Sequence, residues 1–419
     1  MLYAVFSEQK DRNELFTTHH SLFTFLPFYA KITNMSIIKI NDNSNKLFYI
    51  GGVVRDELLG RESLDVDITY VGNAIEYCSK FGEVVQVNPD FGTVRVAIPF
   101  HPSPCTTSPT VEASGEVTVD FASTRSESYP QKGHLPVVEK IGCSLKEDVM
   151  RRDFTINTLA KSVTTGEIVD YVGGLEDLKN KKLRVLHHKS FIDDPTRIIR
   201  GLKFATRFGF ELEEHTKKLQ DEYLANINYD MSYKRVKKEL IETFSLNSQS
   251  AFQKFIDQKI YKLVTPNDVE IPKVDVEKFI NKYLADQPSS CPAAIWLVYV
   301  GSLGDLSRLP LTKIEQKILD DVPKEVLKSD FELYKTFQNA RIETVLLYAI
   351  TKDETGARHY LDDLRKIKLD ITGKDLQTLG IKPSPKYQEI FDEVLKVKLK
   401  NPSMAKDDEI EEALSSYRK

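Results

Sequence analysis

The stretch FYIGGVVRDELLGRESLDVDITYVG, from Phe48 to Gly72, decides the fold that this sequence predicts. Aromatic and β-branched residues predict a strand from Leu47 to Ile50, and the apolar run from Val53 to Leu59 predicts a helix directly after it. A second strand is expected from Val66 to Val71. Two glycines separate the first strand from the helix, so a phosphate group can approach the backbone and the amide donors of the helix N-terminus.

Two acids, Asp65 and Asp67, stand one residue apart at this second strand. Residues i and i+2 of a strand point to the same face, so the two carboxylates are expected side by side. Such a pair suits Mg²⁺ in phosphoryl or nucleotidyl transfer, and both acids are candidate catalytic and metal-binding residues. Alternatively they are solvated acids at a strand end, because an Asp-x-Asp pattern also arises by chance. Gly51, Gly52 and Arg55, a cation early in the helix, favour the phosphate interpretation.

Asp120 is a further candidate catalytic acid. It stands between Val119 and Phe121 on a strand expected from Val117 to Ala122. It completes a three-acid metal site if that strand lies beside the first pair. The alternative is a strand-end acid that pairs with Arg125.

The remaining pattern predicts an α+β fold, in which a β-rich head is followed by an all-α remainder. Further strands are expected from Val84 to Val87 and from Val94 to Ile98, and the Pro-, Ser- and Thr-rich segment from Pro99 to Gly115 is expected to be a long hairpin loop. After Leu175 no further strands are expected, because apolar residues recur at helical spacing. From about Ile371 the chain predicts a small terminal module.

The composition is that of an ordinary globular protein, with 419 residues, of which 41% are hydrophobic and 29% charged. That length gives a prior of roughly two to four domains. The net charge of -4 neither supports nor excludes an RNA partner, because phosphate binding needs only a local basic surface. The four cysteines lack CxxC spacing, which argues against a zinc site or a disulfide framework. We expect a cytoplasmic protein without a membrane span, since no uncharged run of ~20 apolar residues occurs.

Four motifs stand in a fixed order between about residues 46 and 245. They are FYIGGVVRDELLGRESLDVDITYVG (Phe48 to Gly72), RRDFTINTLA (Arg151 to Ala160), IVDYVGGLEDL (Ile168 to Leu178) and FIDDPTRIIRGLKFATRFGF (Phe191 to Phe210). Together they resemble the bacterial and eukaryotic class, class II, of the tRNA nucleotidyltransferase and poly(A) polymerase family. Several motifs in the right order are far more specific than any one of them.

The resemblance implies a DNA polymerase β-like nucleotidyltransferase head with a mixed or antiparallel sheet and helices, followed by an all-α neck, body and tail. The expected division is an N-terminal extension at 1–34, the head at 35–165, the neck at 166–245, a helical body at 246–370 and a helical tail at 371–419. The neck would carry the nucleotide-selecting helices, and the helical domains would hold the acceptor arm of tRNA.

Arg151, Arg152 and Asp153 place two cations next to an acid, before an apolar, helix-like run. This set suits a triphosphate and the ribose hydroxyls. The alternative is a solvated helix start with Asp153 as its cap. The resemblance implies that Arg152 and Asp153 contact the nucleotide and that Asn157 supports the site.

Asp194 and Arg197 are spaced i, i+3 on an expected helix, which puts an acceptor and a donor on one face. Ordinarily such a pair is a surface ion pair. However, cytosine and adenine both present an amine donor beside a ring-nitrogen acceptor, which guanine and uracil do not. An acid and an arginine can therefore select C and A without a nucleic-acid template. Arg200, one turn further on, is a candidate contact to base or phosphate.

Two further segments belong to the expected site. The segment from Arg125 to Glu147 is rich in Pro, Gly, Lys and Glu and is expected to be a mobile loop. In the family, a loop at this position is associated with switching the pocket to accept ATP. The stretch from Met231 to Leu240 resembles the family motif that stabilises the neck helix, although the family usually has Glu where Lys234 stands. Its basic residues, Lys234, Arg235, Lys237 and Lys238, form either a surface that touches RNA or a solvated face.

The resemblance thus implies a Mg²⁺-dependent transferase that adds CMP and AMP to the 3′ end of tRNA without a template, known as CCA addition, and releases pyrophosphate. Its partners would be CTP, ATP and the acceptor end of tRNA, with no membrane partner. An A-adding enzyme that completes tRNA ending in CC stays open, as does a poly(A) polymerase. From another class, a noncatalytic RNA-binding protein on the same fold would be favoured by a broken acid pair or Arg-Arg-Asp run, and both are intact.

Overall fold

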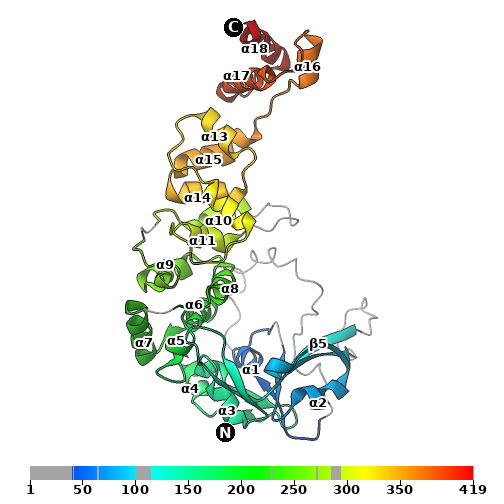
Figure 1. The fold of residues 1–419 in the computed structure, drawn as a ribbon, viewed down its shortest axis with the longest axis vertical. Helices are drawn as coiled ribbons and strands as arrows, with labels where there is room; N and C mark the ends of the chain where they lie inside the picture. The colour runs from blue at the N-terminus through cyan, green and yellow to red at the C-terminus, as the bar shows by residue number, and fades with distance from the viewer. Residues whose placement is uncertain are drawn as a thin grey trace, which may run out of the picture.

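The molecule is elongated, with its β-rich part at one end and a helical tail at the other (Figure 1). The computed structural model describes residues 40, 42–63, 66–100, 115–227, 230–269, 272–284 and 294–418. The expected extension at 1–34 and residues 101–114 of the expected hairpin loop lie outside the described residues. From the β-rich end, the helices of the neck come first, then those of the body and last those of the tail.

The head is built on a seven-stranded mixed sheet with the strand order β3-β4-β5-β2-β1-β8-β9. Its strands are β1 (Leu47–Ile50), β2 (Asp67–Tyr70), β3 (Glu83–Asn88), β4 (Thr93–Phe100), β5 (Gly115–Ser123), β8 (Ala160–Ser162) and β9 (Ile168–Val169). β2 and β5 pair in parallel, and the other neighbours pair antiparallel. All five strands expected in this part of the chain are present, and the predicted mixed α+β head is confirmed.

Short helices follow two of the central strands. α1 (Gly52–Leu58) begins directly after β1, and α2 (Ala74–Cys78) follows β2 with the Asn73 side chain accepting a hydrogen bond from the Ile75 amide. Two 3₁₀ turns, η2 (Ser79–Phe81) and η3 (Pro89–Phe91), flank β3. Fully buried apolar side chains from these elements share one core, among them Val54, Ile68, Val119 and Phe121. This core fixes the start of β2, where Asp67 stands.

A separate antiparallel ribbon is formed by β6 (Arg125–Ser128) and β7 (Val137–Ile141). The prediction of a mobile loop from Arg125 to Glu147 is therefore wrong for much of that segment. Its prolines and glycines lie outside the two strands, whereas valine and isoleucine in β7 favour an extended backbone. α3 (Leu145–Met150) follows, and its N-terminus is closed by a capping box.

The neck packs α6 against α8 beside the head. Its elements are α4 (Gly174–Lys179), α5 (Ser190–Asp193), α6 (Thr196–Phe208), α7 (Glu214–Ala225) and α8 (Tyr233–Phe244), while η4 (Thr155–Asn157) precedes β8 in the head. One parallel pair of strands, β10 (Lys182–Leu183) with β11 (Glu211–Leu212), lies among these helices. The expectation that no strand follows Leu175 is therefore wrong. Each of these strands is only two residues long, too short to leave an alternating pattern in the sequence.

The body and tail are helical. The body contains α9 (Gln249–Asp257), η5 (Ile260–Leu263), α10 (Val276–Leu284), α11 (Ile295–Gly301), α12 (Lys313–Asp320), α13 (Asp330–Phe337), α14 (Ile342–Thr351), α15 (Glu354–Asp362) and η6 (Leu364–Lys366), and the tail contains α16 (Gly373–Thr378), α17 (Lys386–Lys400) and α18 (Lys406–Arg418). One apolar core runs through head, neck and body and reaches α17 of the tail, a second cluster lies within the tail, and a small third one lies in the head. In the described part of the chain, no helix is long and apolar enough to cross a membrane. The expected domain boundaries stay a prediction.

Candidate active site

A cavity of about 480 Å³ lies where the head meets the neck helices α6 and α8. Its lining brings together Asp67 and all the predicted nucleotide-binding residues, which are Gly51, Gly52, Arg55, Arg152, Asp153, Asn157, Asp194, Arg197 and Arg200. They come from the turn before α1, the segment after α3 and the region around α5 and α6. The fold therefore gathers motifs that are far apart in the sequence at a single site.

The acids of the predicted metal site stand on neighbouring strands. Asp67 begins β2 and lies directly opposite Asp120 in the parallel pairing with β5, and both line an adjoining cavity of about 370 Å³. Asp120 pairs with Arg95, so the alternative pairing with Arg125 is wrong. Asp65 lies outside the described residues. Two carboxylates beside one cavity are hard oxygen donors of the kind that divalent cations bind, although no cluster of three candidate ligands occurs among the described residues.

Gly51 forms the turn that leads from β1 into α1. Its φ of +72° lies in the region that favours glycine, and a Cβ there would sit 3.2 Å from Nη1 of Arg152. The Gly51 amide donates to the carbonyl of Leu159 at 3.0 Å, which ties the turn to the segment that carries Asn157. Gly52 is the first residue of α1. The turn thus holds the backbone close to the arginine, as a phosphate-binding turn requires.

Arg55 is buried, and it joins the head to the neck. Its Nη1 donates to Oδ1 of Asn157 at 2.5 Å, and its Nε donates to Asp56 at 2.9 Å. The guanidinium lies over the ring of Phe208 on α6, 4.4 Å from its centroid. Burial lowers the pKa of Arg55, although the charge of Asp56 acts in the opposite direction. Arg55 lines the cavity, but its side chain is held in place by these contacts. It therefore acts as a clamp between α1 and α6.

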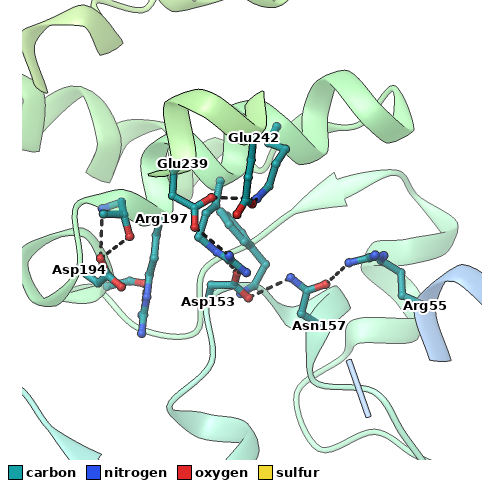
Figure 2. Close-up of polar contacts among 12 residues, drawn as sticks. Arg55, Asp153, Asn157, Asp194, Arg197, Glu239 and Glu242 are labelled. Atoms are coloured by element: carbon teal, nitrogen blue, oxygen red, sulfur yellow. Dashed lines mark hydrogen bonds and ion pairs between the residues drawn. The ribbon is translucent and has the colours of Figure 1, made fainter. Parts of the chain in front are cut away.

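Asp153 stands at the centre of a hydrogen-bonded chain (Figure 2). Its Oδ1 accepts from Nδ2 of Asn157 at 2.9 Å, and its Oδ2 accepts from Nε of Arg200 at 2.8 Å. Burial would raise the pKa of Asp153, but the charge of Arg200 and the hydrogen bonds from Asn157 and Arg200 outweigh it, so the pKa lies well below its ordinary value. η4 and β8 follow, so the expected helix after Asp153 and its capping role are wrong.

Asp148, fully buried on α3, holds both arginines of the Arg-Arg-Asp run. Its Oδ1 accepts from Nε and Nη2 of Arg151 at 3.0 and 2.8 Å, and its Oδ2 accepts from Nη2 of Arg152 at 3.2 Å. Burial alone would raise the pKa of Asp148, but the charges of Arg152 and Arg151 outweigh it, and the pKa is lowered. The buried Nε of Arg152 has no hydrogen-bond partner among the described residues, so one donor remains for a ligand.

Asp194 does not lie on one helix with Arg197, as the spacing suggested. It ends α5 in an extended conformation, and its Oδ1 accepts from the amide and the hydroxyl of Thr196 at 3.1 and 2.6 Å. Its Oδ2 pairs with Arg235 on α8. Asp194 therefore holds the first residue of α6, whose N-cap is Pro195, and with 5% of its surface exposed it is not part of a surface ion pair.

Arg197, in the first turn of α6, is only 3% exposed and is held on three sides. Its Nη1 donates to Oγ of Ser190 at 2.7 Å, and its Nη2 donates to the carbonyl of Arg151 at 2.9 Å and to the hydroxyl of Tyr129 at 3.1 Å. Tyr129 follows β6, so the ribbon that replaces the expected loop reaches the predicted base-reading residue. Both Nη2 hydrogens are already engaged.

Several residues of the site were not predicted from the sequence, namely Glu127, Tyr129, Ser190, Arg235 and Glu239. Arg235 belongs to the basic stretch from Met231 to Leu240, but that stretch does not present one basic face. Arg235 points to Asp194 and Lys237 is buried against Oε2 of Glu315 at 2.6 Å, while Lys234 and Lys238, one turn apart on α8, are exposed. Both interpretations of the basic residues are therefore wrong for Arg235 and Lys237, and they stay predictions for Lys234 and Lys238. On a helix, the apolar residues Val236 and Leu240 mark the side that faces the core. Helical spacing from them would have shown that the basic side chains of this stretch point in different directions.

Comparison with known proteins places this site in a family. Residues 47–184 match the model of the poly(A) polymerase head domain. The chain is 30% identical to an A-adding tRNA nucleotidyltransferase of Halalkalibacterium halodurans, over 82% of this chain and 82% of the relative. The chain belongs to the tRNA nucleotidyltransferase and poly(A) polymerase family. Nucleotidyltransferases of this family use a divalent metal ion.

Members of the family also differ from this chain in length. An A-adding tRNA nucleotidyltransferase of Geobacter sulfurreducens is 31% identical over 87% of this chain, yet the chain spans only 44% of that relative. A solved structure of a CCA-adding enzyme, apo form II, superimposes with a TM-score of 0.70 at 23% identity, covering 88% of this chain and 92% of that one. At that identity the similarity establishes the fold, from head to tail.

Proposed function

We propose that this protein adds CMP and AMP to the 3′ end of tRNA, using CTP and ATP and releasing pyrophosphate, so that the end becomes CCA. The observation that carries the proposal is the single cavity that holds a glycine turn, Asp67, the Arg152 and Asp153 pair, and the buried Asp194 and Arg197. A cavity with phosphate-binding, ribose-binding and base-reading groups in one lining fits a nucleoside triphosphate. The proposed setting is the cytoplasm, which suits the buried free thiols of Cys78 and Cys143.

The acids give the chemistry. Asp65, Asp67 and Asp120 would hold Mg²⁺, which when bound would neutralise the triphosphate and acidify the attacking hydroxyl. The 3′ oxygen of tRNA forms a bond to the α-phosphorus as its proton leaves, and the bond from that phosphorus to pyrophosphate breaks. Arg152, with its unpaired Nε, would bind phosphate oxygens beside the Gly51 turn.

Asp194 and Arg197 would choose the base. The carboxylate would accept from the exocyclic amine of C or A, and the guanidinium would donate to the ring nitrogen. Because the Nη2 hydrogens of Arg197 are taken by Tyr129 and Arg151, a base that accepts from Nη2 would replace the Tyr129 hydroxyl. In this proposal the segment that joins β6 to β7, which carries Tyr129, moves each time that a nucleotide enters.

An A-adding enzyme, which completes tRNA that already ends in CC, is the second candidate. The names of the Halalkalibacterium and Geobacter relatives favour it, and both candidates use the same cavity. A noncatalytic RNA-binding protein on this fold is less well supported, because the acid pair and the Arg-Arg-Asp run are intact. A poly(A) polymerase is less well supported because these relatives are named tRNA nucleotidyltransferases.

The test is incorporation of labelled nucleotides into two substrates, a tRNA lacking CCA and the same tRNA ending in CC. CCA addition predicts that CMP enters the first substrate and that AMP then follows. AMP incorporation into the second substrate alone would replace the proposal with A addition. The Asp67→Asn variant is expected to lose about a hundredfold or more in rate, the scale of one lost electrostatic contact in a transition state. No incorporation by the wild-type protein into either substrate would overturn both candidates.

A further inference from the structure

A chain of charged side chains runs from the nucleotide cavity into the neck and ends on α8 (Figure 2). Arg200 on α6 donates from Nη1 to Oε1 of Glu239 at 3.2 Å, on the side away from its two bonds to Asp153. Lys203, one turn along α6, donates to Oε2 of Glu239 at 2.8 Å and to Glu242 at 2.5 Å. Glu239 of the neck thereby contacts Arg200, and Arg200 in turn contacts Asp153 of the head.

We propose that Glu239 is a positioning residue for the ribose of the incoming nucleotide, acting through Arg200 on Asp153. The inference rests on the proposed function, and it gives Arg200 a different duty from the direct base or phosphate contact that its spacing suggested. It also gives Glu239, which the sequence analysis did not select, a part in choosing the substrate.

The acceptor capacity of Asp153 is the first argument. Its Oδ1 accepts from the amide of Phe154 and from Asn157, and its Oδ2 accepts from Nε and Nη2 of Arg200. A carboxylate has about four acceptor sites, so a ribose hydroxyl that binds Asp153 takes over one bond from Arg200 or Asn157. Glu239 is the second anchor that keeps Arg200 in place while Asp153 makes this exchange.

The burial of Glu239 is the second argument. This glutamate is 8% exposed and lines the cavity between two cations, Arg200 and Lys203. Buried ion pairs contribute little to stability beyond what well-packed apolar side chains of similar volume provide. Arg200, by contrast, uses three of its five N–H groups on Asp153 and Glu239, a geometry that fixes the plane of its guanidinium. The ion pairs of Glu239 are therefore better suited to orienting the guanidinium of Arg200 than to stabilising the fold.

The chain offers a matched control in Glu242. It lies on the same helix and shares Lys203 with Glu239, but of the two glutamates only Glu239 contacts Arg200. Glu239→Gln and Glu242→Gln therefore remove the same charge from the same Lys203 neighbourhood, and only the first changes the acceptor of a hydrogen bond from Arg200.

The experiment measures kcat and KM of the full-length variants on tRNA ending in CC, with ATP and with 2′-deoxy-ATP, beside their thermal unfolding. For Glu239→Gln we expect KM for ATP to rise about fivefold to thirtyfold and the preference for ATP over 2′-deoxy-ATP to fall by a similar factor, the effect of one or two kcal/mol. For Glu242→Gln we expect wild-type values. Should Glu239→Gln not fold, Arg200→Lys, which keeps the charge but lacks the planar fork, carries the same expectation.

Wild-type KM and ribose preference in the Glu239→Gln and Arg200→Lys variants would overturn the inference, as would equal effects of Glu239→Gln and Glu242→Gln. A purely structural role would lower the unfolding temperature without changing the preference between ATP and 2′-deoxy-ATP, and that result also overturns it. If the wild-type protein transfers no nucleotide, the proposed function fails and the inference fails with it. Activity of the wild type with an unchanged Glu239→Gln variant overturns the inference alone.

Discussion

The guanidinium of Arg95 donates two hydrogen bonds, each 2.7 Å long, to the two carboxylate oxygens of Asp120. The side chains are 38% and 47% exposed, so the pair is a surface ion pair worth about 0–1 kcal/mol. Asp120 lies opposite Asp67 on the neighbouring strand. A divalent cation that uses both carboxylates would therefore compete with Arg95 for the charge of Asp120, and an exposed pair of this strength can be displaced.

We predict that Arg95→Gln lowers the Mg²⁺ concentration needed for half-maximal activity by up to about fivefold, because the competing cation is removed. Binding of Mn²⁺, followed by electron paramagnetic resonance without nucleotide, should tighten by a similar factor. Arg125→Gln is the control, since Arg125 pairs with Glu127 and not with Asp120. Weaker Mn²⁺ binding in Arg95→Gln would show that the arginine assists the metal site.

The Gly51 turn gives a second prediction. In Gly51→Ala, the new Cβ would meet Nη1 of Arg152 at 3.2 Å in a backbone conformation that glycine favours, so we expect a loss of about 1–3 kcal/mol in unfolding free energy and a higher KM for nucleotide. Gly60→Ala is the matched control, because Gly60 also has a positive φ of +65° but has no atom within 4 Å of its Cβ position. Urea unfolding should show a loss in both variants. A raised KM in Gly60→Ala would contradict the assignment of the effect to Arg152.

The hydroxyl of Ser190 holds Nη1 of Arg197 and is fully buried. We predict that Ser190→Ala reduces the preference for CTP and ATP over UTP and GTP by about two- to tenfold, the effect of one hydrogen bond. Competition between labelled nucleotides on one tRNA measures this preference directly. Ser245→Ala is the control, since that hydroxyl donates only to the carbonyl of Ile241 within α8 and should leave selection unchanged. An unchanged preference in Ser190→Ala would mean that Arg197 is oriented by its other partners.

Asp148 gives a prediction on pH. Its pKa is lowered in the folded protein, so its contribution to stability is present above the ordinary aspartate value of about 3.9 and is lost as pH falls through the folded value. Asp148→Asn should cost about 1–3 kcal/mol at pH 7, and the gap to the wild type should narrow below about pH 4. Urea unfolding at several pH values measures the gap, with Asp90→Asn, at an exposed position, as control. A gap that stays constant down to pH 3 would exclude this role.

The predictable part of the molecule was the part that depends on local pattern. Strands β1 to β5 and helix α1 follow from periodicity and from glycine at a turn. That Asp120 lies beside Asp67 could be stated only as a condition, because it depends on which strands pair. Asp194 was misassigned to a helix although Asp-Pro-Thr is itself a helix-start signal, with proline suited to the first turn. The partner of Asp120 was wrong because an ion pair between strands depends on register, which single-sequence periodicity does not supply.

Contacts between segments far apart in the chain could not be predicted from the sequence. Arg235 contacts Asp194 within the neck across 41 positions, and Arg200 of the neck contacts Asp153 of the head across 47. Three of these side chains also had local explanations, which were a helix cap for Asp153, a surface ion pair for Asp194 and a solvated helix face for Arg235. Only the packing of α6 and α8 against the head turns these charges into a lining of one cavity.

The clamp formed by Arg55 has a practical consequence for chimeras. Its side chain is held by Asn157 and Asp56 on the head and by the rings of Phe204 and Phe208 on α6, while Arg207 reaches back to Asp56 at 3.2 Å. A head grafted from a relative with another nucleotide preference, joined at residue 165, would meet foreign aromatic rings and lose these contacts. A graft that ends after Phe244 would carry both the head and the neck helices that contact it, and should therefore transfer the donor's specificity intact.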